Sequence, residues 1–309
     1  MTSIVVLGSI NMDLVVKTDL VPRAGETIKG AVFKAIPGGK GANQAVAARR
    51  MGAEVRMVGA VGRDAFGSEL KQSLAEAGVD VSCVMEKGDV STGTATIIVD
   101  SEGNNRIIIV PGANDCLSCE DVDGVEDLIA KASMILMQFE IPFETIDHAV
   151  KMAGRYSVPV VLNPAPAYAV SDEFLSGVNY LIVNETEAEI LSGIAVHDAD
   201  SAKKAAEDLQ TRGVETVIVT LGEQGAILLT AAGFLHIPAR KVKVVDTTAA
   251  GDTFTGAFVV AVSEGMSLED AARIAVSAGT LAVTRFGAQP SIPDREELNA
   301  VAQRLSRYQ

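Results

Sequence analysis

The sequence predicts an α/β fold in which helices cover both faces of a central, mainly parallel sheet. Two observations favour this class. Short apolar runs alternate with segments of helical periodicity along most of the chain. The runs, such as 4–7, are apolar at consecutive positions, which is typical of strands buried between two layers of helices. Strand, helix and strand in repeated succession also require the right-handed crossovers that join parallel strands.

The predicted elements follow in order along the chain. Strands are expected at 4–7, 55–60, 133–139, 158–162, 180–183, 216–220 and 226–230. Helices are expected at 43–51, 66–77, 142–154, 185–191, 201–212, 250–264, 267–285 and 294–307. Gly52 and Gly78 follow the first two helices, in the position where a glycine commonly ends a helix. No linker divides the sequence, so we expect one domain over residues 1–309.

Two stretches interrupt the alternation. Residues 14–36 have no helical period and contain Pro22, Gly25 and Gly30. Residues 94–100 and 106–110 are apolar and flank a polar stretch rich in turn-forming residues, which indicates a hairpin. The inserted segments, about 14–36 and 94–110, are either two surface excursions or a small antiparallel sheet that closes over a cleft as a lid.

Composition and charge narrow the class of partner. The chain has 26 Lys and Arg against 40 Asp and Glu, a formal net charge of −14. An acidic chain repels phosphate backbones, so we expect no nucleic-acid partner. No apolar stretch approaches the ~18 residues that span a bilayer, and the N-terminus lacks a basic segment. We therefore expect no membrane partner and a cytoplasmic location.

The segment Gly38-Gly-Lys-Gly41 looks like a phosphate-binding loop but departs from the nucleotide-binding patterns. Lys40 is followed by Gly41 instead of Ser or Thr, and Lys34 stands where the first glycine of a Walker loop belongs. The glycines either let the backbone approach a ligand closely or form a tight turn that Asn43 caps. Both alternatives stay open at this point.

A second candidate is Asp246-Thr-Thr-Ala-Ala-Gly-Asp252, where an apolar strand runs through small residues into a helix. Free amides of Ala250, Gly251 and Asp252 at the positive end of that helix would attract an anion such as a phosphate. Asp252 is then either a general base for a hydroxyl that attacks phosphorus, or the N-cap of the helix.

Two further loops are candidates for nucleotide contacts. The stretch Thr220-Leu-Gly-Glu-Gln-Gly225 lies between two predicted strands, and either wraps a nucleotide with its amides or is a hairpin turn. Asn184 and Glu187 follow another strand and share one face of the next helix. They either hold Mg²⁺ through its waters or cap that helix.

In this order the segments resemble the ribokinase-like (PfkB) carbohydrate kinases, from Ser3 to about Pro293. The two most specific matches are Gly38-Gly-Lys-Gly-Ala-Asn43 and Asp246 to Phe254. Further matching segments begin at Gly8, Met137, Asn163, Asn184 and Gly287. The resemblance implies a ribokinase-like fold with a β lid, and ATP-dependent phosphorylation of D-ribose at its 5-hydroxyl.

The resemblance also implies a role for each matching residue. Asp252 is the implied base, with the amides of Ala250 and Gly251 completing an anion hole. The implied sugar ligands are Asn11, Asp13, Gly39, Lys40, Gly41, Asn43, Glu140 and Asp252. The implied ATP contacts are Asn184, Thr220, Leu221, Gly222, Glu223, Gln224, Gly225, Gly251, Asp252 and Val276. The implied K⁺ site, for an activating monovalent cation, comprises Asp246, Thr248, Ala282, Arg285, Gly287 and Ser291, while Glu187 acts on Mg²⁺ through water. Lid strands of this family can pair between subunits, so a homodimer is expected.

Other functions remain as alternatives. The nearest alternative is a kinase for 2-deoxyribose, fructose or a nucleoside. A nucleoside kinase would need aromatic rings to stack the base, whereas Phe33 is the only aromatic residue in the predicted lid segments. A sugar-phosphate kinase would need cations for its second phosphate, such as Lys17, Lys29, Lys34 and Arg106. A non-catalytic sugar or nucleotide sensor would typically lack the base, whereas Asp252 is present.

Overall fold

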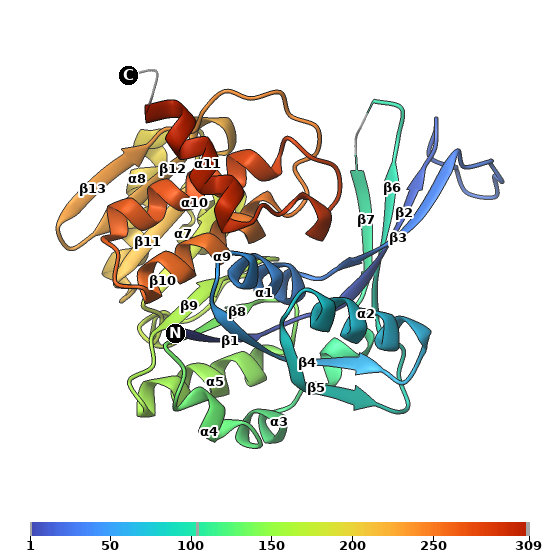
Figure 1. Cartoon of the computed structure of the whole chain (residues 1–309), viewed down its shortest axis with the longest axis horizontal. Helices are drawn as coiled ribbons and strands as arrows, with labels where there is room; N and C mark the ends of the chain where they lie inside the picture. The colour runs from blue at the N-terminus through green and yellow to red at the C-terminus, as the bar shows by residue number, and fades with distance from the viewer. Residues whose placement is uncertain (1, 103–104, 307–309) are drawn as a thin grey trace.

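The computed structural model of the chain describes residues 2–102 and 105–306. A nine-stranded sheet forms its centre (Figure 1). In spatial order its strands are β13 (Gly233–Ile237), β12 (Ala226–Thr230), β11 (Thr216–Thr220), β10 (Tyr180–Asn184), β9 (Val160–Asn163), β8 (Met134–Gln138), β1 (Ser3–Leu7), β4 (Glu54–Gly62) and β5 (Asp80–Lys87). Only the β11–β12 and β12–β13 pairs of this sheet are antiparallel, so the predicted mainly parallel sheet is confirmed.

Helices cover both faces of the sheet, as the doubly apolar strands predicted. One face packs against α1 (Lys40–Arg50), α2 (Ala65–Glu76), α9 (Ala250–Ser263), α10 (Leu268–Ala282) and α11 (Arg295–Ser306). The other packs against α3 (Cys119–Asp123), α4 (Glu126–Ile129), α5 (Phe143–Arg155), α6 (Asp172–Leu175), α7 (Glu185–Ser192) and α8 (Ala199–Thr211). Within β1, Ile4 and Val6 face the first layer while Val5 and Leu7 face the second. None of the described helices is long and apolar enough to cross a membrane.

The two inserted stretches do pair into a second, four-stranded sheet, which we call the lid. Its strand order is β3 (Val32–Gly38), β2 (Asn11–Lys17), β6 (Gly93–Val99) and β7 (Asn105–Val110). The β2–β3 and β6–β7 pairs are antiparallel, whereas the central β2–β6 pair is parallel. The lid projects away from the main sheet at one end (Figure 1). Residues 103–104 of the predicted hairpin turn and Arg307 of the predicted last helix lie outside the described residues.

Some boundaries differ from those predicted. Strand β2 begins at Asn11, three residues before the predicted insertion, because the chain passes directly from the main sheet into the lid. The strands β5 and β13 were not expected, since their apolar residues are interspersed with polar ones. Helix α1 begins at Lys40 rather than at residue 43, and α10 ends at Ala282 rather than at residue 285. The strand expected at 242–245, before Asp246, is wrong, because these residues form part of the loop between β13 and α9.

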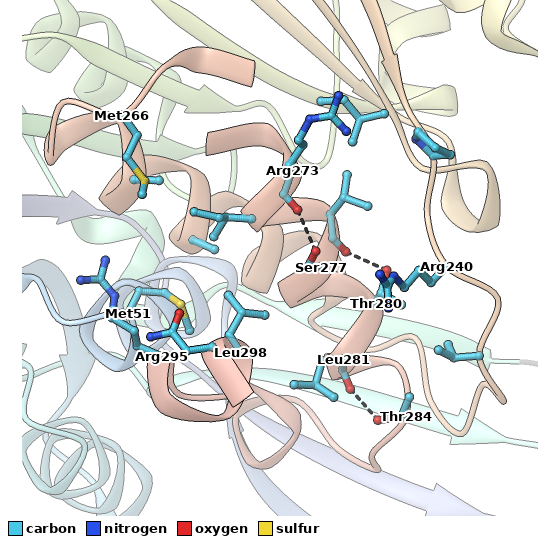
Figure 2. Close-up of a pocket in the computed structure, with 18 of the residues that line it drawn as sticks. Met51, Arg240, Met266, Arg273, Ser277, Thr280, Leu281, Thr284, Arg295 and Leu298 are labelled. Carbon is cyan, nitrogen blue, oxygen red and sulfur yellow. Dashed lines mark hydrogen bonds between the residues drawn. The ribbon is translucent and has the colours of Figure 1, made fainter. Parts of the chain in front are cut away.

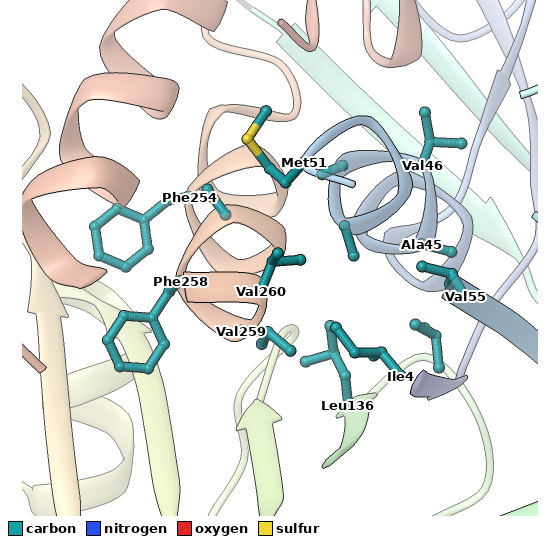
Figure 3. Packing of buried hydrophobic residues seen from close by; sticks show 14 of the residues in the cluster. Ile4, Ala45, Val46, Met51, Val55, Leu136, Phe254, Phe258, Val259 and Val260 are labelled. Carbon is teal, nitrogen blue, oxygen red and sulfur yellow. The ribbon is translucent and has the colours of Figure 1, made fainter. Parts of the chain in front are cut away.

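The crossing of α1 and α9 fixes the position of the site. A Cβ atom on Gly256 would lie 2.5 Å from the Cβ of Ala47, so the missing side chain lets the two helices approach closely. Phe254 and Phe258 of α9 pack on the opposite side of that helix, toward α10 and the sheet (Figure 3). One helical turn before the crossing, α9 carries Asp252 and α1 carries Asn43. The two first turns are therefore held side by side.

Candidate active site

Several polar residues lie where strands of the main sheet end. Gln138, Asn163, Asn184 and Thr220 are the last residues of β8, β9, β10 and β11. These strands are parallel, so their carboxyl ends meet at one edge of the sheet, where α/β proteins commonly bind ligands. The first turns of α1 and α9 lie beside this edge, because Gln44 of α1 contacts both Asn163, at the end of β9, and Asp252, on α9.

At the start of α1, the glycines make room for the protein's own backbone. Gly39 has φ of 90°, and a Cβ there would lie 2.7 Å from the amide nitrogen of Asn11. A Cβ on Gly41 would lie 2.6 Å from the amide nitrogen of Ser9. Gly39 is the N-cap residue and Asn43 lies inside the helix, so the alternative in which Asn43 caps the turn is wrong.

The protein itself satisfies the free amides of α1. Glu140 Oε2 accepts from the Lys40 amide at 3.2 Å and from the Ser9 hydroxyl at 2.5 Å. Ser9 Oγ in turn accepts from the Gly41 amide at 3.3 Å. Nearby, Asn11 Oδ1 accepts from Asn114 Nδ2 at 2.7 Å. The N-terminus of α1 is therefore occupied by a protein carboxylate, and most of the implied sugar residues are fixed around it.

Lys40 is a cation surrounded by carboxylates. Burial alone would lower the pKa of Lys40, but Asp252, Glu140, Glu187 and Asp13 raise it above its ordinary value. The pKa of Asp13 is also raised, but here burial contributes to the rise. Burial, followed by the charges of Glu140 and Asp252, raises the pKa of Asp13 to about 7, against a smaller lowering by Lys40. The side chains implied for sugar, base and magnesium thus belong to one electrostatic cluster.

Helix α9 begins differently from α1. Its N-cap is Ala249, in the left-handed region at φ 59°, and Asp252 is the third helical residue. The alternative in which Asp252 is a plain N-cap is therefore wrong. A Cβ on Gly251 would meet nothing within 4 Å. The Ala250 amide, predicted to be free, donates to the Thr247 carbonyl at 3.2 Å. Among the described residues, the Gly251 and Asp252 amides make no hydrogen bond, so these two are free to bind an anion.

The Asp252 carboxylate is buried and held by amides. Asn43 Nδ2 donates to Asp252 Oδ2 at 3.0 Å, and Gln44 Nε2 donates to Oδ1 at 2.9 Å. Asn43 Oδ1 is also buried but has no partner of its own. A buried acceptor without a donor is uncommon in a folded protein, and a ligand hydroxyl would supply the missing bond.

A cavity of about 200 Å³ lies in front of Asp252. Its lining combines Lys40 with the strand ends and the start of α9: Asn163, Ile182, Val183, Asn184, Glu187, Thr220, Thr247, Ala249, Gly251, Asp252 and Thr255. The buried Thr255 hydroxyl on this wall also has no partner. The structure therefore brings the implied base, anion hole and part of the implied ATP contacts around one space.

The Asn184–Glu187 pair forms a helix cap. Asn184 Oδ1 accepts from the Glu187 amide at 2.9 Å, and Glu187 Oε2 accepts from the Asn184 amide at 2.9 Å. The capping alternative is thus confirmed. Burial raises the pKa of Glu187, although the Asn184 amide and Lys40 oppose it. Both residues also line the 200 Å³ cavity, so the cap does not remove them from the site.

The turn after β11 is only partly in the cavity. Thr220 lines it, whereas the Leu221 side chain is buried in the core below the sheet. Gly222–Gln224 form a 3-10 turn between the antiparallel strands β11 and β12, which confirms the hairpin alternative. The four residues 222–225 line neither this cavity nor the larger one described next.

A second cavity, of about 920 Å³, lies along α10 (Figure 2). Val276, the implied adenine neighbour, is on its wall with Ser277 and Thr280. Arg240 and Lys241 line the same cavity from the loop after β13, a feature that the sequence did not indicate. Cations beside a large, partly apolar cavity are suited to a nucleotide in an otherwise acidic protein.

Part of the implied potassium site is assembled by hydrogen bonds. Asp246 Oδ1 accepts from the Thr248 amide at 2.9 Å, and Oδ2 accepts from the Gly287 amide at 2.9 Å. Burial would raise the pKa of Asp246, but these bonds lower it below its ordinary value. The Arg285 side chain instead donates two hydrogen bonds to Glu297.

Four contacts brace the segment that contains Gly287. Arg50, at the end of α1, donates to the carbonyls of Gln289, at 2.9 Å, and Ile292. The Ser291 hydroxyl donates to the carbonyl of Ala288 at 2.8 Å. From the lid, Lys34 Nζ lies 4.6 Å from the centre of the Phe286 ring. The lid strand β3 therefore rests on the residue next to Gly287.

The sequence indicated no role for Ser9, Gln44, Gln138 or Asn163. Ser9 bonds to Glu140 and Gln44 bonds to Asp252, while Gln138 and Asn163 both bond to Gln44. Gln138 and Asn163 are each the last residue of a buried strand. Their place at the carboxyl end of a parallel strand, where α/β proteins bind ligands, could have identified them from the sequence. The role of Gln44 depends on the helix crossing, which no local pattern reports.

Comparison with known proteins identifies the family. The model for the pfkB family of carbohydrate kinases matches residues 1–295. The chain belongs to this family. It is 42% identical to a ribokinase of Haemophilus influenzae over 96% of both chains. It is 38% identical to a deoxyribokinase of Salmonella typhi, over 96% of this chain and 97% of that one. A ribokinase of Arabidopsis thaliana, solved in complex with ribose and ATP, superposes with a TM-score of 0.90 at 34% identity, covering 97% of each chain. The chain is accordingly a kinase with the expected fold.

Proposed function

We propose that the protein transfers the γ-phosphoryl group of ATP to the 5-hydroxyl of D-ribose. One observation carries this proposal. The buried Asp252, Gly251 at the start of α9 and Lys40 line a single cavity. A carboxylate beside free amides at a helix N-terminus is the arrangement that phosphoryl transfer to a hydroxyl requires.

In the proposed reaction, Asp252 accepts the proton of the sugar hydroxyl while that oxygen bonds to the γ-phosphorus. The bond from phosphorus to the bridging oxygen of ATP breaks at the same time, and ADP leaves with the electron pair. The amides of Gly251 and Asp252 stabilise the negative charge on the moving phosphoryl group. Asp252 need hold the proton only until product leaves, so an ordinary carboxylate serves.

The sugar is proposed to lie between α1 and the first residues of the lid. Asp13 and Glu140 would accept from vicinal hydroxyls, and the Asn43 Oδ1 atom that has no partner would accept from another. A Cβ on Gly38 would lie 2.3 Å from Asp13 Oδ2, so the carboxylate packs directly on this loop. The other proposed contacts are Asn11, Lys40 and the backbone of Gly39 and Gly41.

The nucleotide is proposed to span both cavities, with its phosphates at the start of α9 and its base along α10. Glu187, Asn184 and Thr220 would face the phosphates, and Val276 the adenine. In the described residues, no cluster of three or more His, Cys, Asp or Glu side chains could hold a metal ion. Magnesium therefore fits as an ion carried by the ATP phosphates, with Glu187 reaching it through water. When bound, it neutralises phosphate charge.

A monovalent cation fits the loop around Asp246. That loop offers one carboxylate, while Thr248, Ala282, Arg285, Gly287 and Ser291 offer mainly backbone carbonyls, a donor set that suits K⁺ better than a divalent ion. The hydrogen bond from Gly287 to Asp246 already joins the two segments that would surround it. The charge of the bound K⁺ would lie just outside the proposed anion hole.

The sugar specificity is tested by ADP release with MgATP across a panel of ribose, 2-deoxyribose, fructose and a nucleoside. We expect the highest kcat/KM with ribose. The similarity to a deoxyribokinase makes 2-deoxyribose the second candidate. If any other sugar exceeds ribose by about tenfold, equivalent to about 1.4 kcal/mol in transition-state binding, the substrate assignment is overturned.

We also propose a homodimer formed through the lid. Strand β7 is at the edge of the lid sheet, and its Ile107, Ile108, Ile109 and Val110 are 44–62% exposed. An open apolar edge is a surface that a second copy of the chain would cover. Light scattering is expected to give twice the chain mass, and Ile108→Lys to give a monomer. A monomeric wild-type protein would reject this assembly.

A further inference from the structure

The base in the proposed reaction is held by a residue to which no role has been assigned. Gln44 is fully buried in the first turns of α1, and its Nε2 donates to Asp252 Oδ1 at 2.9 Å. Asn43 occupies the other carboxylate oxygen, Oδ2, at 3.0 Å. Each carboxylate oxygen thus accepts one amide hydrogen bond from α1, and a proton from the sugar would use a lone pair that these bonds leave free. The orientation of the carboxylate therefore depends on this amide.

The orientation of the Gln44 amide is itself fixed by two strand ends. Its Nε2 also donates to Asn163 Oδ1 at 2.9 Å, so both of its hydrogens are used. Its Oε1 accepts from Gln138 Nε2 at 2.7 Å. Gln138 and Asn163 are paired across β8 and β9, so they lie side by side beneath the helix. The buried Gln138 Oε1 has no partner, so the contact that orients the Gln138 amide is its bond to Gln44.

The direction of these hydrogen bonds is set by a group that cannot be reversed. Asn163 Nδ2 donates to the backbone carbonyl of Ile182 at 2.9 Å, and a carbonyl can only accept. Asn163 must therefore present its oxygen to Gln44, and Gln44 must present its NH₂ group to Asn163 and Asp252. A rotated Gln44 amide would place oxygen against two oxygens and nitrogen against the nitrogen of Gln138.

We infer that Gln44 is a positioning residue for phosphoryl transfer, and that Gln138 and Asn163 hold its amide in the direction that supports Asp252. The inference rests on the proposed function, because it assigns Asp252 as the base. Gln44 does not line either cavity, so its effect passes through Asp252 and not through a substrate. A displaced base lowers the rate of the chemical step more than it lowers sugar binding.

The first test compares Gln44→Met, which keeps the length of the side chain, with Gln44→Glu, which keeps its shape but cannot donate. We expect each to lower kcat by about 10- to 100-fold. The KM for ribose should stay within about threefold of wild type, because Gln44 makes no proposed sugar contact. A kcat within twofold of wild type in folded Gln44→Met protein would overturn the inference, as would a loss confined to KM.

The second test uses Gln138→Glu, at a residue two contacts away from the base. Its carboxylate would accept from Gln44 Nε2, which turns the amide and withdraws the donor from Asp252. We expect kcat to fall severalfold in the wild-type background and not to fall further in Gln44→Met. Two losses that multiply would show independent effects and would contradict the relay.

Thr145→Val is the matched control for lost stability. Thr145 is buried on α5, and its hydroxyl donates to the Leu117 carbonyl at 2.7 Å, away from both cavities. We expect it to lower Tm without changing kcat. All variants are assayed with the sugar that the wild-type enzyme turns over fastest. A wild type that prefers another sugar thus corrects the proposed substrate, while the ratio of variant to wild-type kcat still decides the role of Gln44.

Discussion

Helices α1 and α9 both begin after small residues and lack a side-chain cap, yet only one of them is open to an anion. At α1, the Lys40 and Gly41 amides bond to Glu140 and Ser9, and side chains at Gly39 or Gly41 would collide with backbone. At α9, the Gly251 and Asp252 amides make no hydrogen bond within the described residues, and a Cβ on Gly251 would meet nothing within 4 Å. A glycine-rich helix start is therefore no anion site in itself. What decides is whether the protein has already satisfied the amides.

The comparison is tested most strongly at Asp252. We expect Asp252→Asn to retain ribose and ATP binding but to lower kcat by at least about 10²-fold, the usual scale for loss of a general base. Binding is measured by calorimetry and turnover by ADP release. The matched control is Asp270→Asn, because Asp270 is also the third residue of its helix, where it supports the Ser267 cap. Near-normal turnover in Asp252→Asn would remove the base from the proposed mechanism.

The two helix starts should respond oppositely to the same substitution. Gly251→Ala has room in the fold, and alanine favours the helix, so Tm should stay level or rise. Its methyl group would enter the proposed phosphate site and lower kcat/KM for ATP by about 10- to 100-fold. Gly41→Ala would instead lower the free energy of unfolding by about 1–3 kcal/mol, because its Cβ meets backbone. Equal effects at the two positions, measured by thermal unfolding and by turnover, would refute the distinction.

Sugar binding at the α1 side should depend on pH near neutrality. Asp13 has a pKa of about 7, raised mainly by burial, so it is mostly protonated at pH 6. If ribose requires its carboxylate, the KM for ribose should rise about tenfold between pH 8 and pH 6, as the competent fraction falls. A KM that is flat over this range would show that the protonated form binds as well.

The same shift makes a prediction for stability. A carboxyl whose pKa is raised on folding stabilises the folded protein below its unfolded pKa, and this contribution is lost as pH rises through about 7. Asp13→Asn should therefore raise Tm at pH 8 more than at pH 5, while it weakens ribose binding. A Tm gain that is the same at both pH values would mean that the carboxyl is not strained in the folded protein.

The smallest expected effect concerns the proposed K⁺ site around Asp246. Activity in buffer containing only Na⁺ or Tris should be well below that in K⁺, and Asp246→Asn should remove most of the difference. Thermal unfolding of both proteins, with and without K⁺, checks binding independently of turnover. Equal rates in all buffers would make the Asp246 hydrogen bonds purely structural.

The sequence predicted most of the fold because strands such as β1 are apolar on both faces and helices such as α5 show a clear period. It also identified Asp252, but it left open whether that residue capped the helix. Whether Asp252 is the N-cap depends on where the helix begins. The N-cap is Ala249, in the left-handed conformation, which lies three residues before Asp252.

What the sequence missed depends on contacts between distant segments. The contact of Gln44 with Asp252 joins residues 208 positions apart, through a helix crossing that requires Gly256. The parallel β2–β6 pair likewise depends on how two insertions meet. The period of apolar residues indicates only local structure, so it predicts neither the Gln44–Asp252 contact nor the β2–β6 pair.

The order of strands in the main sheet also has a consequence for the newly made chain. On one side of β1 the strands β4 and β5 follow in sequence, and on the other side β8 to β13 are added outward one after another. A chain that emerges from its N-terminus can therefore extend an existing edge with each new strand. Helix α9, which carries the proposed base, follows the last strand, so the proposed sugar and phosphate sites are completed only when the last third of the chain has been made.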